Sequence, residues 1–150
     1  MEIRTIRRNE LDQLCRLYDQ LVPGDVNYEA MCRTYDAVCG DSDFHLVGVF
    51  QADSLIATAT LTRCLDLTGD TRFYYSMENF VVDEAHRRTG VGTYLMSYLE
   101  DYVTAHNGRY MNFTSSAART GAHRFYGELG YAPDYVKGFK KTFPAATEEV

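Results

Sequence analysis

The segment ENFVVDEAHRRTGVGTYLM, residues 78–96, joins the end of a strand to the start of a helix through two arginines and two glycines. Residues 72–82 alternate as a long central strand does, and residues 92–106 carry apolar side chains at helical spacing. A loop that leads into a helix presents unpaired backbone N–H groups and the positive end of the helix dipole. The segment therefore predicts a loop that binds a phosphate or a pyrophosphate.

Two other phosphate-binding loops fit this segment poorly. A P-loop has Lys followed by Ser or Thr after its last glycine, whereas Thr93 and Tyr94 follow Gly92 here. A dinucleotide-binding loop has its first glycine directly after the strand and a third glycine where this chain has Leu95. On the motif alone, a simple turn with two surface arginines stays open as an alternative.

The composition favours one globular domain, residues 1–150. With 21 acidic and 15 basic side chains the net charge is −6, which disfavours binding to nucleic acid. No window approaches about 18 uninterrupted apolar residues and residues 1–14 contain no apolar leader, so we expect a cytoplasmic protein that does not bind membranes. The four cysteines form no close pair, so we expect buried thiols in a reducing compartment rather than zinc ligands or disulfides.

Hydrophobic periodicity and turn residues predict the other elements. We expect further strands at 2–6, 45–50, 55–65, 110–115 and 137–143, and helices at about 10–21, 28–39 and 121–130, the first of them capped by Asn9. Their order predicts an α/β (α+β) domain with a mixed, mostly antiparallel sheet and one strand–helix–strand crossover. In the central strand Ser76 and Glu78 should lie on a polar face. The opposite, packed face should carry Phe73, Tyr75, Met77, Asn79 and Val81.

Two segments carry a resemblance to a known family. Residues 78–96 resemble the pantetheine and pyrophosphate segment of the GNAT superfamily of acetyl-CoA-dependent N-acetyltransferases, whose motif Q/R-x-x-G-x-G/A is matched by Arg87, Gly90 and Gly92. The segment AARTGAHRFYGELGY, residues 117–131, is similar to the distal helix and loop of that family. The resemblance covers the C-terminal half well and the first 70 residues only by the order of strands and helices.

The resemblance implies acetyl transfer from acetyl-CoA to an amine by direct attack, with CoA as the second product. It implies a cleft where two central strands splay apart, with the cofactor on one strand edge and on the glycine loop. The cofactor-binding positions that it implies are Phe80, Val81, Val82, Arg87, Arg88, Thr89, Gly90, Val91, Gly92, Thr93, Arg119 and Tyr126.

Two positions are candidates for catalytic roles. Tyr126 matches the family's residue beside the leaving sulfur, although a packing tyrosine is the alternative. Glu78 is the candidate base because it lies on the polar face of the central strand, although a solvated strand glutamate is the alternative. His123 could reach substrate or cofactor but more often such a histidine packs or caps, and His86 is expected to be structural.

Departures from the family pattern bear on the acceptor. Arg119 stands where many members have Asn. An Arg at this position is similar to the small-amine branch of the family, which includes aminoalkylphosphonate and glucosamine-phosphate acetyltransferases. Arg88 stands where Gly is common. We therefore expect a small primary amine, with an anionic group held by Arg119 or Lys137. The alternatives are a non-catalytic CoA-binding module and an acetyltransferase for protein lysines or N-termini. A short last strand also predicts a homodimer.

Overall fold

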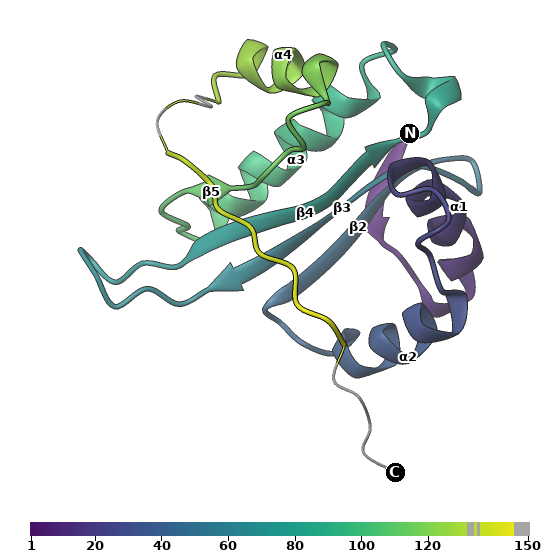
Figure 1. Ribbon diagram of the computed structural model, residues 1–150, viewed down its shortest axis with the longest axis horizontal. Helices are drawn as coiled ribbons and strands as arrows, with labels where there is room; N and C mark the ends of the chain where they lie inside the picture. The colour runs from purple at the N-terminus through teal and green to yellow at the C-terminus, as the bar shows by residue number, and fades with distance from the viewer. Residues whose placement is uncertain (132–133, 135, 146–150) are drawn as a thin grey trace. The chain divides into compact units, whose positions relative to one another are not determined.

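The computed structural model describes residues 1–131, 134 and 136–145 and divides into two compact units, residues 1–113 and the residues from 114 onward. The first unit contains a sheet, three helices and two short 3-10 turns (Figure 1). In chain order its elements are β1 (Glu2–Thr5), a 3-10 turn (Arg8–Glu10), α1 (Leu11–Leu21), α2 (Tyr28–Val38), β2 (Phe44–Gln51), β3 (Ser54–Cys64), β4 (Tyr74–Val82), a 3-10 turn (Glu84–His86), α3 (Val91–Ala105) and β5 (Met111–Asn112).

The sheet has the strand order β1-β2-β3-β4-β5. The first three pairings are antiparallel, and β4 pairs with β5 in parallel. Parallel neighbours need a crossover connection, which α3 supplies. The α/β class, the mixed sheet and its single crossover are therefore confirmed.

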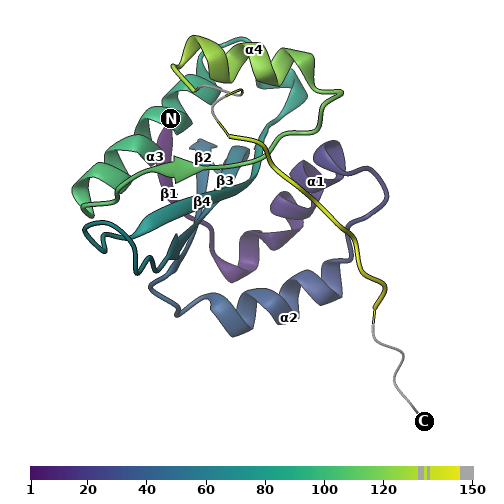
Figure 2. The same cartoon turned by 60° about the vertical axis from the view of Figure 1, so that its left-hand side comes forward.

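Helices α1 and α2 cover one face of the sheet and α3 covers the other (Figure 2). Full burial of a large aliphatic side chain stabilises the fold by about 1.5–3 kcal/mol, so each layer is held by its apolar stripe. The first layer includes Ile6, Leu11, Leu14, Leu17, Leu46, Phe50, Leu55 and Val81. The stripe of α3 consists of Val91, Leu95, Met96, Leu99 and Val103.

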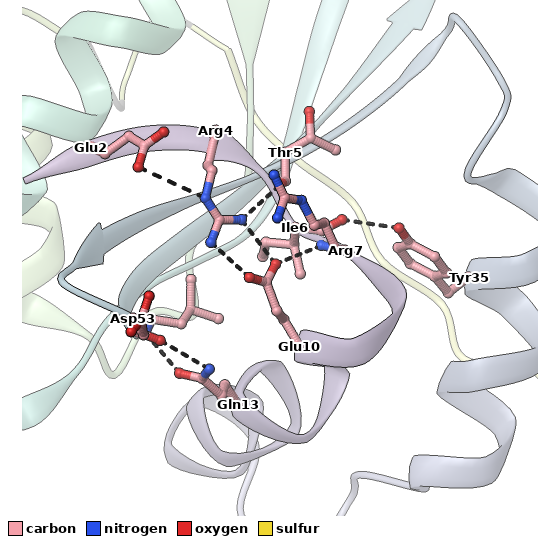
Figure 3. A network of polar contacts seen from close by, with 10 residues as sticks. Glu2, Arg4, Thr5, Ile6, Arg7, Glu10, Gln13, Tyr35 and Asp53 are labelled. Atoms are coloured by element: carbon pink, nitrogen blue, oxygen red, sulfur yellow. Dashed lines mark hydrogen bonds and ion pairs between the residues drawn. The ribbon is translucent and has the colours of Figure 1, made fainter.

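A polar network ties β1 to the start of α1 (Figure 3). Arg4 donates to both carboxylate oxygens of Glu10 at 2.9 and 2.6 Å, and the Arg7 N–H donates to the same carboxylate at 2.8 Å. Asn9 is not the N-cap that its side chain suggested, because it lies inside the 3-10 turn that precedes α1. Glu10 meets the exposed N–H of Arg7 instead.

The register between β3 and β4 contains a bulge. Thr58 is opposite Val81 and Thr60 is opposite Glu78, so two residues of β4 stand opposite Ala59 alone. Asn79, one of these two, has a φ of +52° and is exposed. The expectation that Asn79 packs on the same face as Met77 is wrong, because a bulge interrupts the two-residue alternation.

The second unit contains α4 (Thr120–Glu128), and Gly130 follows it with a φ of +90°, as expected for a helix end. The last strand is a wrong prediction, because residues 137–143 have no strand structure. Their apolar side chains are not buried: Phe139 is 94% exposed and Phe143 is 73% exposed. The alternating pattern therefore has no core to pack against.

The cysteines correct a further expectation. All four are free thiols, but only Cys32 is buried, while Cys15 and Cys64 are half-buried and Cys39 is exposed.

No helix within the described part of the chain has the length and apolar character needed to cross a bilayer.

Candidate active site

The glycine loop lies where the sequence places it, between the end of β4 and the start of α3. Gly90 is the N-cap of α3 and has a φ of +89°, a conformation that favours glycine. The first hydrogen bond of the helix runs from the Tyr94 N–H to the Gly90 carbonyl at 2.9 Å. Among the described residues, none accepts a hydrogen bond from the N–H groups of residues 88–93. These groups, at the positive end of α3, could hold an anion.

The conformation of the glycine loop depends on the two arginines and on Thr89. Arg88 is exposed and has a φ of +60°, which explains physically why glycine suits this position. The Arg87 Nε donates to the Val82 carbonyl at 3.2 Å, and the Thr89 hydroxyl donates to the His86 carbonyl at 2.6 Å. The Thr89 side chain therefore stabilises the loop, and its backbone N–H is left for a ligand.

The edge of β4 offers a second set of backbone groups. The Asp83 N–H donates to the Ile56 carbonyl on β3 at 2.9 Å. By strand alternation the backbone groups of Val81 also face β3, and those of Val82 face away from it. On that side β5 pairs with β4 only at Tyr75 and Ser76.

Phe80, Val81 and Val82 share one expected role, binding of the cofactor, but they differ in their place on β4. Phe80 and Val82 lie on the part of the β4 edge beyond the two residue pairs with β5. The Val81 side chain is buried and packs in the core cluster with residues of α1. An extended, amide-containing chain such as pantetheine can pair with an edge of this kind through Phe80 and Val82.

Glu78 lies on the face of the sheet that α1 and α2 cover, and it is exposed. The Ser76 hydroxyl donates to the Glu78 Oε1 at 3.3 Å, which confirms that both side chains share this polar face. An exposed carboxylate next to the bulge can accept a proton from a bound amine, directly or through water.

Tyr18, on α1, is a candidate site residue that the sequence analysis did not single out. Burial raises the pKa of the Tyr18 phenol, while hydrogen bonds with Thr60 and Asn79 oppose that shift. Tyr18 therefore brings a hydroxyl from α1 to the bulge beside Glu78. No sequence signal marked this contact, because it depends on the bulge turning Asn79 towards α1.

In the second unit, Arg119 and Tyr126 belong to the same helical segment. Arg119 is the residue at the N-cap position of α4, and Tyr126 lies in its last turn. Burial raises the pKa of the Tyr126 phenol, and the positive charge of Arg119 partly offsets this. The His123 Nε2 lies 3.0 Å from the Ser116 carbonyl, so its ring contacts the segment that precedes α4. Lys137 lies in the irregular segment after this helix.

Comparison with protein families agrees with the two sequence motifs. The model of the acetyltransferase (GNAT) family matches residues 11–131, which include the glycine loop, the bulged strand and α4. The chain belongs to the GNAT acetyltransferase family. It is therefore an acyltransferase, as the two motifs predicted.

Solved GNAT structures and other acetyltransferases share the fold. A putative acetyltransferase from Agrobacterium tumefaciens superposes with a TM-score of 0.88 at 23% identity, over 95% of this chain and all (100%) of the other. Glucosamine-6-phosphate N-acetyltransferase from Arabidopsis thaliana gives 0.78 at 17% identity, over 97% and 98%. An aminoglycoside 6'-N-acetyltransferase from Acinetobacter haemolyticus gives 0.76 at 16% identity, over 96% and 100%. No curated protein matches this GNAT chain by sequence.

Proposed function

We propose that this GNAT protein transfers the acetyl group of acetyl-CoA to the primary amine of a small molecule by direct attack and releases CoA. The observation that carries the proposal is the row of N–H groups at residues 88–93, with no acceptor among the described residues, at the start of α3. Such a row suits the pyrophosphate of CoA. Phe80 and Val82 would hold the pantetheine arm, and one of their N–H groups would stabilise the thioester oxygen as charge develops.

In the proposed reaction the amine nitrogen attacks the thioester carbonyl, a C–N bond forms, and the C–S bond breaks. Glu78 accepts the amine proton, directly or through water, because its exposed carboxylate lies beside the bulge. The electron pair of the broken bond leaves on the CoA sulfur.

Tyr126 acts on that sulfur. An ordinary phenol titrates near ~10 and a thiol near ~8.5, so complete proton transfer from tyrosine to the thiolate is uphill by about 2 kcal/mol. Burial raises the pKa of Tyr126 further. We therefore assign Tyr126 the role of a hydrogen-bond donor to the leaving thiolate, with solvent supplying the final proton.

The acceptor proposed is a compact amine with an anionic group, held by Arg119 or Lys137. Two proteins of the same fold are named for N-acetylation of glucosamine-6-phosphate and of an aminoglycoside, both small amines. The net charge of −6 also argues against a nucleic-acid-bound acceptor.

Free-thiol production from acetyl-CoA tests this function. The panel contains aminophosphonates, amino sugars, polyamines and lysine peptides, and mass spectrometry identifies each acetylated product. Reactions without donor correct for the four free cysteines, of which Cys39 is exposed. Turnover of lysine peptides alone would refute the small-amine proposal. Binding of acetyl-CoA with no turnover of any amine would favour a non-catalytic CoA-binding module.

A cytoplasmic homodimer is also proposed. Two-fold dimers are the commonest soluble oligomers. The strand at 137–143 that first suggested pairing is not formed, so the proposal now rests on that general tendency. Light scattering at micromolar concentration tests it, and a monomeric mass would overturn it.

A further inference from the structure

The side-chain amide of Gln20, on α1, connects that helix to the segment that follows β4. Its Nε2 donates to the Asp83 Oδ1 at 3.0 Å, and its Oε1 accepts from the Glu84 N–H at 2.9 Å. One amide group thus uses both its donor and its acceptor on two consecutive residues. A contact of this kind restrains both the side chain and the backbone of the segment.

Asp83 in turn holds His86 in place through two hydrogen bonds. Its second carboxylate oxygen, Oδ2, lies 2.8 Å from the His86 Nδ1, and its carbonyl accepts from the His86 N–H at 2.8 Å. Burial opposes ionisation, but hydrogen bonds from Gln20 and His86 hold the pKa of Asp83 below its ordinary value. Asp83 is therefore a charged acceptor held between α1 and the 3-10 turn, and such bonds are stronger than neutral ones.

The glycine loop comes directly after His86 in the sequence. The His86 carbonyl accepts the Thr89 hydroxyl, so the contacts run from Gln20 through Asp83 and His86 to Thr89. His86 also lines two surface cavities. One, of about 370 Å³, is shared with Thr89 and Val91, and the other, of about 270 Å³, is shared with Gln20 and Asp83. His86 thus lies between the loop and α1.

We propose that Gln20 is a positioning residue for the acetyl donor. Acting through Asp83 and His86, it holds residues 87–93 in the geometry that presents their N–H groups to the pyrophosphate. The inference rests on the proposed function, because it concerns the affinity of the same loop for acetyl-CoA.

Gln13 provides a matched control on the same helix. Its Nε2 donates to the Asp53 carbonyl at 3.1 Å and its Oε1 accepts from the Leu55 N–H at 2.8 Å (Figure 3). It therefore makes the same kind of two-sided amide contact, but with the β2–β3 hairpin. A purely structural role for such contacts predicts equal effects at the two positions.

The kinetic test compares Gln20→Ala with Gln13→Ala. Because two hydrogen bonds that order the loop are lost, Gln20→Ala should raise the KM and Kd for acetyl-CoA about 10-fold and leave kcat at saturating donor within about twofold. Gln13→Ala should leave the KM for acetyl-CoA unchanged at a similar loss of stability. Unchanged donor affinity in Gln20→Ala, or an equal loss in both variants, would overturn the proposal.

Restoring the contact with reversed polarity gives a second test. Gln20→Glu sets a carboxylate against that of Asp83 and should weaken donor binding. Adding Asp83→Asn supplies a donor to Glu at position 20 and keeps an acceptor for His86, so the double variant should recover most of the affinity. Absence of recovery in a folded double variant would contradict the positioning role.

Amide hydrogen exchange without donor separates this inference from the proposed function. Gln20→Ala should speed exchange at Glu84, His86 and Tyr94, whose N–H groups are hydrogen-bonded at the two ends of the loop, and Gln13→Ala should not. If wild-type protein does not bind acetyl-CoA, the proposed function and the donor role of Gln20 both fail. If it binds and exchange in the loop is unaffected by Gln20→Ala, only the positioning inference fails.

Discussion

Glu78 and Val81 lie on the same face of β4, opposite Thr60 and Thr58, although strict alternation would place residues three apart on opposite faces. The bulge at Asn79 and Phe80 produces this arrangement. It leaves Glu78 at the last regular position before the strand changes phase, and after the bulge the backbone groups of Val82 face away from β3. The candidate base and the candidate cofactor edge therefore meet at one distortion.

The first prediction concerns the base. Glu78→Gln keeps the size of the side chain but removes its proton-accepting charge, so kcat should fall roughly 100-fold or more with acetyl-CoA affinity unchanged. In the wild type, kcat/KM should rise with pH as the amine, which titrates near ~10, loses its proton. Steady-state kinetics against pH and calorimetry measure these effects. Ser76→Ala, which removes only the hydroxyl beside Glu78, is the control and should lose far less. A fully active Glu78→Gln protein would exclude Glu78 as the base.

The second prediction concerns departure of the thiol. Tyr126→Phe keeps the aromatic ring and removes the hydroxyl that would donate to the sulfur. We expect kcat to fall about 10- to 1,000-fold and the Kd for CoA to change little, as for a group that acts mainly in the transition state. Single-turnover kinetics and calorimetry test this. Weakened CoA binding with normal kcat would instead make Tyr126 a binding or packing residue.

The third prediction concerns the glycine loop. Gly92 lies in the first turn of α3 and has no positive φ, so replacement does not strain its backbone, whereas Gly90 has a φ of +89°. Gly92→Asp puts a negative charge at the positive end of the helix, which should maintain or slightly raise stability. The same charge should repel the pyrophosphate and raise the Kd for acetyl-CoA at least about 10-fold. Denaturant unfolding and calorimetry measure the two effects. Normal affinity in the folded variant would remove the basis for placing the donor here.

The fourth prediction concerns stability and pH. Burial, with a smaller contribution from His106, lowers the pKa of His45, whose ring stacks on Tyr102 with centroids 4.1 Å apart. Since the unfolded state binds the proton more readily, the free energy of unfolding should decrease as pH falls below about 6.5. His45→Phe keeps the stacking ring and cannot titrate. Denaturant unfolding at pH 7 and pH 5 should show a larger loss of stability in wild type than in this variant, and equal losses would contradict the assignment.

The local patterns of the sequence determined most of the elements and the position of the glycine loop. The β2–β3 hairpin, β4, α2 and α3 follow from periodicity and turn residues acting over a few neighbours, because side-chain direction repeats every two or 3.6 residues. The backbone conformation at Gly90 follows in the same way, since glycine adopts a positive φ with little cost. Two motifs of this local kind were sufficient to indicate the family.

Features that join distant segments were decided by the tertiary structure. The bulge at Asn79 is defined by the pairing of β4 with β3. The hydrogen bond from Gln20 to Asp83 joins residues that are 63 positions apart in the sequence. The pattern at 137–143 resembles a strand, but a strand forms only where a partner accepts its hydrogen bonds and a core buries its alternate side chains. Periodicity specifies which side chains share a face of one element. Packing decides which groups of other elements contact that face. It brings Tyr18 of α1 to the bulge of β4 and Gln20 of α1 to the segment before the glycine loop.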